Sequence, residues 1–342
     1  MVQHVSGRDA GRSLAGVHLL LVREGLPVDV VTGLVTSRHP DAVRTPEGGL
    51  RLGRHTRLEG PLLLDAAAAS AAGVPGPWRA AWALECPEER EGPPLAGATD
   101  RDGLARAFPA GLPVGTERAA VDLGIALARR LEGALRVHPS GVVLRPDPGA
   151  WVDRVVVSRY WLAPPDARDV VVATVPEAAL ATEGAAWTGL RPEAVAALEA
   201  EGSGEGLTDA EREGLHLAAD RRDGIAASAG VLDGYALVVP LGGVVDAAGT
   251  TADSGVVEVR VSAAEDLPPV LAPLGWSSGA VEYRITWWPG DEAEGEREVP
   301  TEEHRAARAE AAAVVRALSD ALVRAVQGVV LDAEGFPLTR TG

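Results

Sequence analysis

Residues 302–331, EEHRAARAEAAAVVRALSDALVRAVQGVVL, decide the fold. They predict a long helix from Glu302 to about Val326, followed by a strand segment, Gly328-Val329-Val330-Leu331. The middle of the chain repeats this order with nearly the same spacing, because a predicted helix over residues 117–132 leads into Gly141-Val142-Val143-Leu144. A repeat of this length indicates that one supersecondary unit occurs twice.

The segments before each helix extend the repeat. A strand that carries tryptophan is predicted upstream of each one, over residues 78–86 in the first half and 280–288 in the second. Both halves then read as β-β-α-β-α-β. The other predicted elements are strands 27–37 and 50–58 and helix 62–72 in the first half, and strands 233–240 and 255–262 with a proline-interrupted helix 264–274 in the second.

Residues 150–232 separate the two halves. They begin with a predicted strand over residues 152–162 and continue with short helices, one of which starts at the capping box Thr208-Asp209-Ala210-Glu211. The sequence therefore predicts an α+β fold. Two similar units, residues 1–149 and 233–342, are joined by a mainly helical middle segment, which could instead complete the sheet of either unit.

The chain contains no Lys and no Asn, and its 32 basic residues are all Arg. Such usage is typical of a bacterium with a GC-rich genome. It also excludes several chemistries. A phosphate loop that ends in Gly-Lys-Ser/Thr cannot form, a lysine Schiff base is impossible, and a kinase site that needs both Lys and Asn is absent.

The net charge of −17 is unevenly distributed. Residues 1–150 carry 17 Arg and 17 acidic residues, whereas residues 151–342 carry 15 Arg and 32 acidic residues. Because nucleic-acid binding depends on neutralising phosphates, an acidic second half argues against nucleic acid and against an anionic membrane as partners. The excess of charge also favours solubility.

The compartment is predicted from two observations. The one cysteine, Cys86, excludes an intrachain disulfide, and no apolar run approaches the length of a membrane span. We therefore expect a cytoplasmic protein. Cys86 itself lies on the apolar face of a predicted strand, so we expect a buried structural thiol rather than a nucleophile.

Motifs that would indicate catalysis fail on context. Gly275-Trp276-Ser277-Ser278-Gly279 has the glycine and serine spacing of a nucleophile elbow, but a helix precedes it and a strand follows, which is the reverse of the required order. Asp100-Arg101-Asp102-Gly103 resembles the start of a calcium loop, yet Gly111 stands where a bidentate Glu is needed.

The sequence also lacks a convincing metal site. Its seven His show no ligand spacing, and Glu302, Glu303 and His304 are adjacent on a helix, where they point in different directions. The acidic loop at residues 291–298 is interpreted as a solvated run. We expect no metal and no cofactor.

One strand face combines charge with an exposed aromatic residue. In the predicted strand 280–288, Arg284 and Trp288 lie on the polar face. If this strand pairs with strand 255–262, Trp288 lies across from Glu258 and Arg260. Tryptophan and arginine are the residue types that most often dominate binding interfaces, although a covering loop would explain Trp288 equally well.

Two classes of function follow. The first is a non-enzymatic protein-binding or assembly module that uses Trp288, Arg284, Glu258 and Arg260 to capture a protein partner or a second copy of itself. The second is an enzyme of unrecognised type, with carboxylates and His converging in a cleft between the two units. A concave pocket holding titratable groups from both halves would distinguish the second class.

Overall fold

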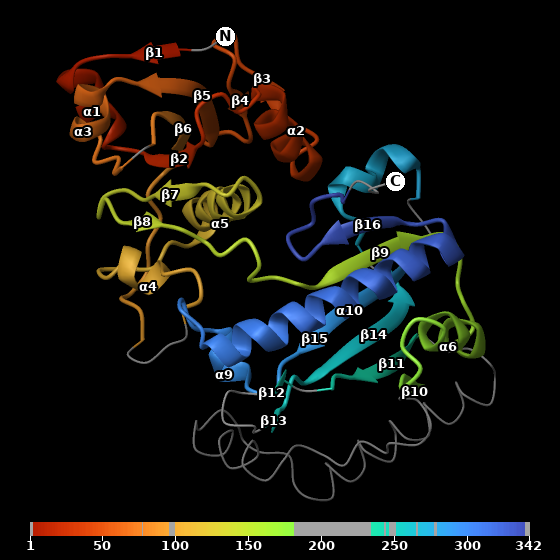
Figure 1. The fold of residues 1–342 in the computed structure, drawn as a ribbon. Helices are drawn as coiled ribbons and strands as arrows, with labels where there is room; N and C mark the ends of the chain where they lie inside the picture. Colours follow the sequence, from red (N-terminus) through yellow and green to blue (C-terminus); the bar gives the residue numbers. More distant parts are fainter. Residues whose placement is uncertain are drawn as a thin grey trace, which may run out of the picture.

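The structure, a computed structural model, describes residues 3–76, 78–95, 100–180, 234–242, 244–245, 251–264, 266–276 and 279–338. These residues form a mixed α and β fold with two large sheets, which lie next to each other in Figure 1. We call residues 3–149 the first unit and the described residues from 150 onward the second unit.

The first unit contains an eight-stranded sheet whose main path runs β3-β4-β5-β6-β2-β7-β8. All neighbours on this path are antiparallel, while β1 adds to β5 in parallel. Its elements are β1 (Gln3–Val5), α1 (Arg8–Leu14), β2 (His18–Val22), α2 (Val28–Arg38), β3 (Val43–Arg44), β4 (Leu50–Arg51), β5 (Arg57–Leu64), α3 (Ala66–Ala71), β6 (Ala80–Glu85), α4 (Leu104–Ala107), α5 (Gly115–Arg130), β7 (Ala134–Arg136) and β8 (Val143–Leu144).

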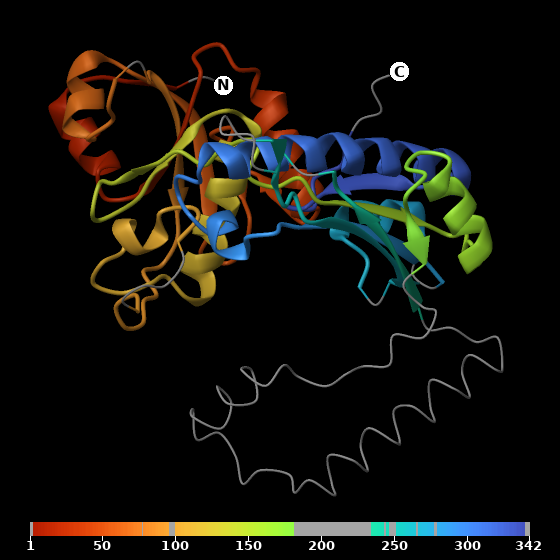
Figure 2. The same ribbon diagram turned by 60° about the horizontal axis from the view of Figure 1, so that its bottom comes forward.

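The second unit contains a six-stranded antiparallel sheet in the order β10-β11-β14-β15-β9-β16. The long helix α10 crosses this sheet, and α6 lies beside α10 on the same side (Figures 1 and 2). Its elements are β9 (Arg154–Ser158), α6 (Pro164–Val172), β10 (Ala179–Leu180), β11 (Gly234–Pro240), the pair β12 (Val244–Val245) and β13 (Thr251–Ala252), β14 (Val256–Ala263), the 3-10 helix η1 (Pro269–Leu274), β15 (Val281–Trp288), α9 (Glu292–Gly295), α10 (Glu302–Val326) and β16 (Val329–Asp332).

The predictions for the second unit are largely confirmed, whereas one predicted strand of the first unit is wrong. Residues 27–37 form helix α2 and not a strand. Their β-branched composition favours a strand, but Val31 and Val35 are one helical turn apart and both are fully buried. Tertiary packing of that stripe against the first core overrides local propensity.

A second correction concerns residues 50–64. The predicted strand 50–58 is divided by a turn into β4 and β5, and β5 continues through Pro61 to Leu64, so the first residues of the predicted helix 62–72 belong to a strand. The β5–β6 pairing shifts register between Glu59 and Leu62, which is where a residue without an N–H can be accommodated. Helix α3 starts later, with the Asp65 carboxylate accepting a hydrogen bond from the Ala68 N–H (2.7 Å).

The start of the predicted middle segment belongs to the second sheet. Strand β9 lies between β15 and β16, so it is a central strand of that sheet. The structure therefore favours the interpretation that residues 150–232 complete a sheet, at least through β9. The predicted helices over residues 191–232 lie outside the described residues.

The two units are packed together through the C-terminal turn. Phe336 follows β16 of the second unit, yet its side chain is fully buried in the core of the first. The guanidinium carbon of Arg38, at the end of α2, lies 5.3 Å from the centre of its ring. Helix α2 also contacts η1, so the first unit meets the second at more than one place.

Candidate functional site

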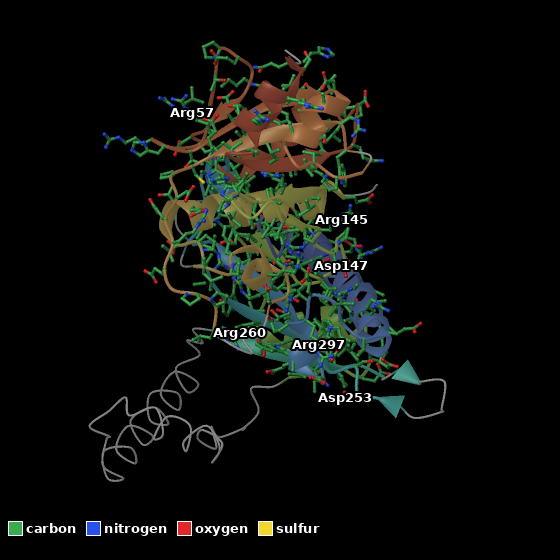
Figure 3. The ribbon with its side chains drawn as sticks, turned by 90° about the vertical axis from the view of Figure 1, so that its left-hand side faces the viewer. Arg57, Arg145, Asp147, Asp253, Arg260 and Arg297 are labelled. Carbon is green, nitrogen blue, oxygen red and sulfur yellow. The ribbon has the colours of Figure 1, made fainter. Side chains whose placement is uncertain are left out.

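The predicted polar face lies on the paired strands β14 and β15. Alternate side chains of these strands point to opposite sides of the sheet. The inward side chains are buried beneath α10 and are Val257, Val259, Val261, Tyr283 and Ile285. The opposite side holds charged side chains, and Figure 3 shows Arg260 on this sheet, far from Arg57 of the first unit.

Two arginines of this face lie directly opposite each other. Arg260 of β14 and Arg284 of β15 are register partners, an arrangement in which like charges repel. Each is paired with the glutamate two residues before it on its own strand. The distance is 3.0 Å from Arg260 Nε to Glu258 Oε1, and 2.6 Å from Arg284 Nη2 to Glu282 Oε1. The arginine side chains remain 61% and 54% exposed, so they can accept further partners.

Trp288 stands at the end of the same face. The predicted pairing of the two strands is confirmed, and the register places Val256 opposite Trp288 and Thr286 opposite Glu258. Trp288 is 46% exposed. Its neighbour Trp287 points to the other side, where its ring nitrogen donates a hydrogen bond to the Ser254 carbonyl (2.8 Å). Of the four predicted binding residues, only Arg260 and Arg284 are direct cross-strand partners.

The structure also shows the burial and the contacts of the other candidate residues. Cys86 is half-buried, and burial raises the pKa of its thiol to about 11, which disfavours the reactive thiolate. His304 is buried against the Trp287 ring, with the ring centres 5.2 Å apart. Among the residues that the structure describes, no three His, Cys, Asp or Glu side chains are placed to hold a metal ion. Ser277 lies outside those residues.

The acidic loop at residues 291–298 is not simply solvated, as the sequence suggested. It folds into α9 and contacts two arginines of the first unit. Arg101 donates from Nε to the Gly295 carbonyl (2.6 Å) and pairs with Glu296, while Arg106 pairs with Glu298 at 2.5 Å. The loop therefore helps to hold the units together, a role that could not be predicted before the units were placed side by side.

A cleft of about 580 Å³ lies where the two units meet. It is bounded by the end of α5, the segment that leads into β9, one face of α10 and the turn after β16. Six of its lining residues are arginines and four are acidic. The arginines are Arg129, Arg130, Arg154, Arg305, Arg308 and Arg316, and the acidic residues are Glu132, Asp153, Asp332 and Glu334.

Several of these charges are paired across the junction. Arg129, which is buried, pairs with Glu334 of the second unit and with Asp102 of the first, the latter at 2.5 Å. Arg130 reaches Asp332 at 3.1 Å. Burial raises the pKa of Asp332 and of Glu334, although the nearby arginines oppose this shift. These pairs fix the walls of the cleft and join the units.

Residues at the rim of the cleft make further ion pairs and hydrogen bonds. Arg308 of α10 pairs with Asp147, which Figure 3 places between the two units. Asp153 accepts a hydrogen bond from the Trp287 backbone N–H (2.9 Å), and burial raises the pKa of its carboxyl group. Trp151 is 43% exposed and lines the cleft.

The composition of the cleft limits its chemistry. Among the described lining residues there is no His, Ser, Thr, Cys or Tyr that could act as a nucleophile or a neutral proton carrier. The cleft does hold titratable groups from both units, which is the geometry that an enzyme was expected to need. Its excess of arginine suits binding of an anion better than acid–base catalysis.

Sequence reasoning missed this cleft, although one signal was present. Arg305, Arg308 and Arg316 recur at helical spacing on the exposed side of a long helix. Arg316, Asp320 and Arg324 also follow one another at intervals of four residues, but within the described residues no ion pair joins them. The facing wall comes from α5, nearly two hundred residues away, and only the tertiary structure brings it there.

Comparison of the chain with protein-family models, curated proteins and solved structures finds no match. Of the helices that the structure describes, none combines the length and the apolar character that crossing a membrane requires. The function must therefore be argued from the two surfaces described above.

Proposed function

We propose that this chain is a non-enzymatic assembly protein, built from two diverged copies of one unit, whose second copy associates with a second chain through its polar sheet face. The observation that carries the proposal is the charge-balanced, solvent-exposed face of β14 and β15. We retain the cytoplasm as the proposed compartment because the chain has a single, unpaired cysteine.

The order of elements supports the duplication. The path β4-β5-β6-β2-β7 in the first sheet corresponds to β11-β14-β15-β9-β16 in the second, strand by strand in both space and sequence. Helix α2 corresponds to α6 and α5 to α10, and in each unit the longer helix covers the central strand. Strand β9, predicted to lie in the connecting segment, thus takes the place of β2.

The helix ends give a second, independent correspondence. Among the residues that the structure describes, two non-glycine residues have a positive φ angle, Glu132 and Gln327, with φ of 50° and 49°. Each lies within two residues of the end of its unit's long helix. A glycine comes next in both cases. A Cβ atom on Gly133 would lie 2.4 Å from the Leu21 carbonyl oxygen, and one on Gly328 would lie 2.6 Å from the Val157 carbonyl oxygen.

The proposed equivalence uses a different register from the repeat predicted from the sequence. The sequence comparison aligned Gly141 with Gly328, whereas the structural equivalence aligns Gly133 with Gly328. The helices then match as well, because Leu123 corresponds to Leu318 and Leu127 to Leu322, and all four leucines are buried. A shared ancestral unit accounts for these agreements more simply than convergence at every position.

The polar face suits association of two identical chains. Two acidic and two basic side chains alternate on it, Glu258, Arg260, Glu282 and Arg284, so the face is neutral within an acidic unit. A two-fold axis through such a face would bring the arginines of one chain to the glutamates of the other. Trp288, at its margin, would bury apolar area in the same contact.

Analytical ultracentrifugation of the full chain tests this proposal. We expect a dimer at about 100 µM protein that dissociates on dilution. Arg260→Glu with Arg284→Glu should give monomers, because four carboxylates would then share the face. Adding Glu258→Arg and Glu282→Arg should restore the dimer, since the charge pattern is inverted but again balanced.

Two further variants sharpen the test. Trp288→Ala with Arg284→Ala should weaken the dimer without unfolding the chain. Arg57→Glu changes an exposed strand arginine of the first unit and should leave the dimer intact. A wild-type chain that stays monomeric throughout this range, or a dimer indifferent to the double charge reversal, would overturn the proposal.

A further inference from the structure

The floor of the cleft between the units is one face of α10. Arg305, Arg308 and Arg316 line it together with Ala309 and Ala312, and these five positions recur at intervals of three or four residues, which places them on one side of the helix. Ala309 and Ala312 leave space between the long arginine side chains. The result is a hollow with a cationic floor rather than a flat charged surface.

Within the part of the chain that the structure describes, three of the cleft arginines have no carboxylate partner. Arg129, Arg130 and Arg308 are neutralised by acidic residues of the junction, as described above. Among the described residues, no carboxylate oxygen lies within 4.0 Å of Arg154, Arg305 or Arg316. Arg154 donates to the Ser319 hydroxyl (2.9 Å) and Arg305 to the Pro300 carbonyl (2.8 Å), both of which are neutral acceptors.

The surroundings of Arg154 are unfavourable for a cation. Burial lowers its pKa, the carboxylates of Asp320 and Asp332 raise it, and the positive charges of Arg316 and Arg130 lower it by smaller amounts than burial does. Neither acid reaches ion-pair distance of Arg154. A half-buried guanidinium group that no described carboxylate contacts carries a desolvation cost that a bound anion would offset. Such a group in a chain of net charge −17 indicates a site for an anionic ligand.

An aromatic side chain lies in the same cleft. Trp151 is three residues before Arg154, which places their Cα atoms at most about 10 Å apart. Arg101 covers one side of the Trp151 ring, with its guanidinium carbon 4.1 Å from the ring centre. The ring still exposes area to the cleft, and a planar ligand group can stack on exposed tryptophan.

We propose that the cleft binds a small organic phosphate of nucleotide size, with its phosphate between Arg154 and Arg316 and its planar ring against Trp151. Guanidinium groups match phosphate oxygens in geometry and charge. A volume of about 580 Å³ is within the range of small-molecule sites. Since walls from both units line the cleft, the ligand would also hold the units in a fixed relative position.

Isothermal titration calorimetry on the full chain at low ionic strength tests the proposal, with adenosine monophosphate, ribose 5-phosphate and inorganic phosphate as probes. We expect adenosine monophosphate to bind most tightly of the three, and added salt to weaken binding by screening. Arg316→Gln should weaken binding about tenfold to a hundredfold, the range for losing a charge-assisted hydrogen bond. This arginine is exposed and unpaired, so its variant should fold normally.

Two matched variants complete the experiment. Arg324→Gln changes an exposed arginine two turns further along α10, outside the cleft, and should bind like the wild type. Trp151→Ala should remove the preference for adenosine monophosphate over ribose 5-phosphate. Absence of binding by all three probes, or equal losses in Arg316→Gln and Arg324→Gln, would refute the phosphate site. Equal affinity of the wild type for the two organic phosphates would refute the stacking on Trp151.

Discussion

The two units share an order of elements but differ in how their sheets are covered. In the first unit, helices α2 and α5 pack on one face, and α1 and α3 pack on the other. In the second, α6 and α10 cover one face, whereas on the other face the described residues contribute a small apolar cluster around η1. The equivalent strands reflect this difference, since β2 is buried along its whole length while β9 begins with two partly exposed residues, Arg154 and Val155.

The two units also differ in where they place charged side chains. The first unit buries a charged group in its interior, because the carboxylate of Glu117 is inaccessible and is held by Arg90, whose Nη2 donates at 2.7 Å, and by the Glu89 N–H. The second unit places its charges on an accessible face. This difference is what the proposed function relies on, since the proposal assigns binding to the accessible face of the second unit.

The largest expected effect tests whether the two units are independent. Phe336→Ala should reduce the free energy of unfolding by about 3–5 kcal/mol, because a fully buried aromatic ring leaves a cavity in the first core. Urea denaturation followed by circular dichroism measures the loss. Leu95→Ala, at a side chain that is 83% exposed, is the control and should change stability by less than about 0.5 kcal/mol.

Phe336 reaches the first core from the second unit, so its removal should also separate the two unfolding transitions. A variant that unfolds in one step at wild-type stability would show that the C-terminal turn does not join the units.

The next largest effect tests the proposed equivalence of the two units. Gly133→Ala and Gly328→Ala should each lower stability by about 1–3 kcal/mol, because the new methyl group would meet the carbonyl oxygen of the neighbouring central strand in both units. Thermal and urea denaturation of the two variants should give similar losses.

A third glycine is the matched control. Gly33 lies inside helix α2 with open space around its Cα, so Gly33→Ala should stabilise the chain by about 0.5–1 kcal/mol. A large loss for only one of the two predicted sites would break the equivalence on which the duplication rests.

A smaller effect depends on pH and concerns the buried charges of the first unit. Burial lowers the pKa of His18 to about 4, and its Nδ1 accepts a hydrogen bond from the His138 backbone N–H. Between pH 4 and 6.5 the unfolded chain therefore binds a proton that the folded chain does not. Stability should rise with pH across this window, with a slope of at most about 1.4 kcal/mol per pH unit from this residue.

His18→Asn separates this contribution from others, because its amide oxygen can still accept from His138. Burial also lowers the pKa of His39 and of His304, so the wild-type slope contains their contributions in the same direction. Urea denaturation at several pH values should give a shallower profile for the variant. Parallel profiles would show that His18 is protonated in the folded chain.

Sequence reasoning predicted the second unit better than the first, for a physical reason. Strands β14 and β15 each have one open face, so their side chains alternate and reveal their period in the sequence. Strand β6 was predicted, although it is buried on both sides from Ala80 to Leu84, but α2 carries valines that favour a strand locally. Where tertiary packing decides the structure, the local sequence pattern no longer predicts which secondary structure forms.

The same reasoning explains which surface could be predicted. Arg260, Arg284 and Trp288 lie on neighbouring strands, so a strand pattern was enough to place them on one face. The cleft forms because the tertiary structure brings Arg154, Arg316 and the end of α5 together, and no pattern in the sequence indicates that they lie close to one another. A site within one element can be deduced from periodicity, whereas a site between units requires the structure.

The smallest expected effect tests the open face directly. Trp288→Ala should change the free energy of unfolding of the monomer by less than about 0.5 kcal/mol, although tryptophan is the largest side chain that the sheet carries. Its ring is almost half exposed, and thus contributes little to folding. The inward neighbour is the control, since Trp287→Ala removes a packed ring and its hydrogen bond to Ser254 and should cost several times more. Equal losses at the two positions, measured by urea denaturation of dilute protein, would mean that this face is part of the core and that the second unit is covered on both sides like the first.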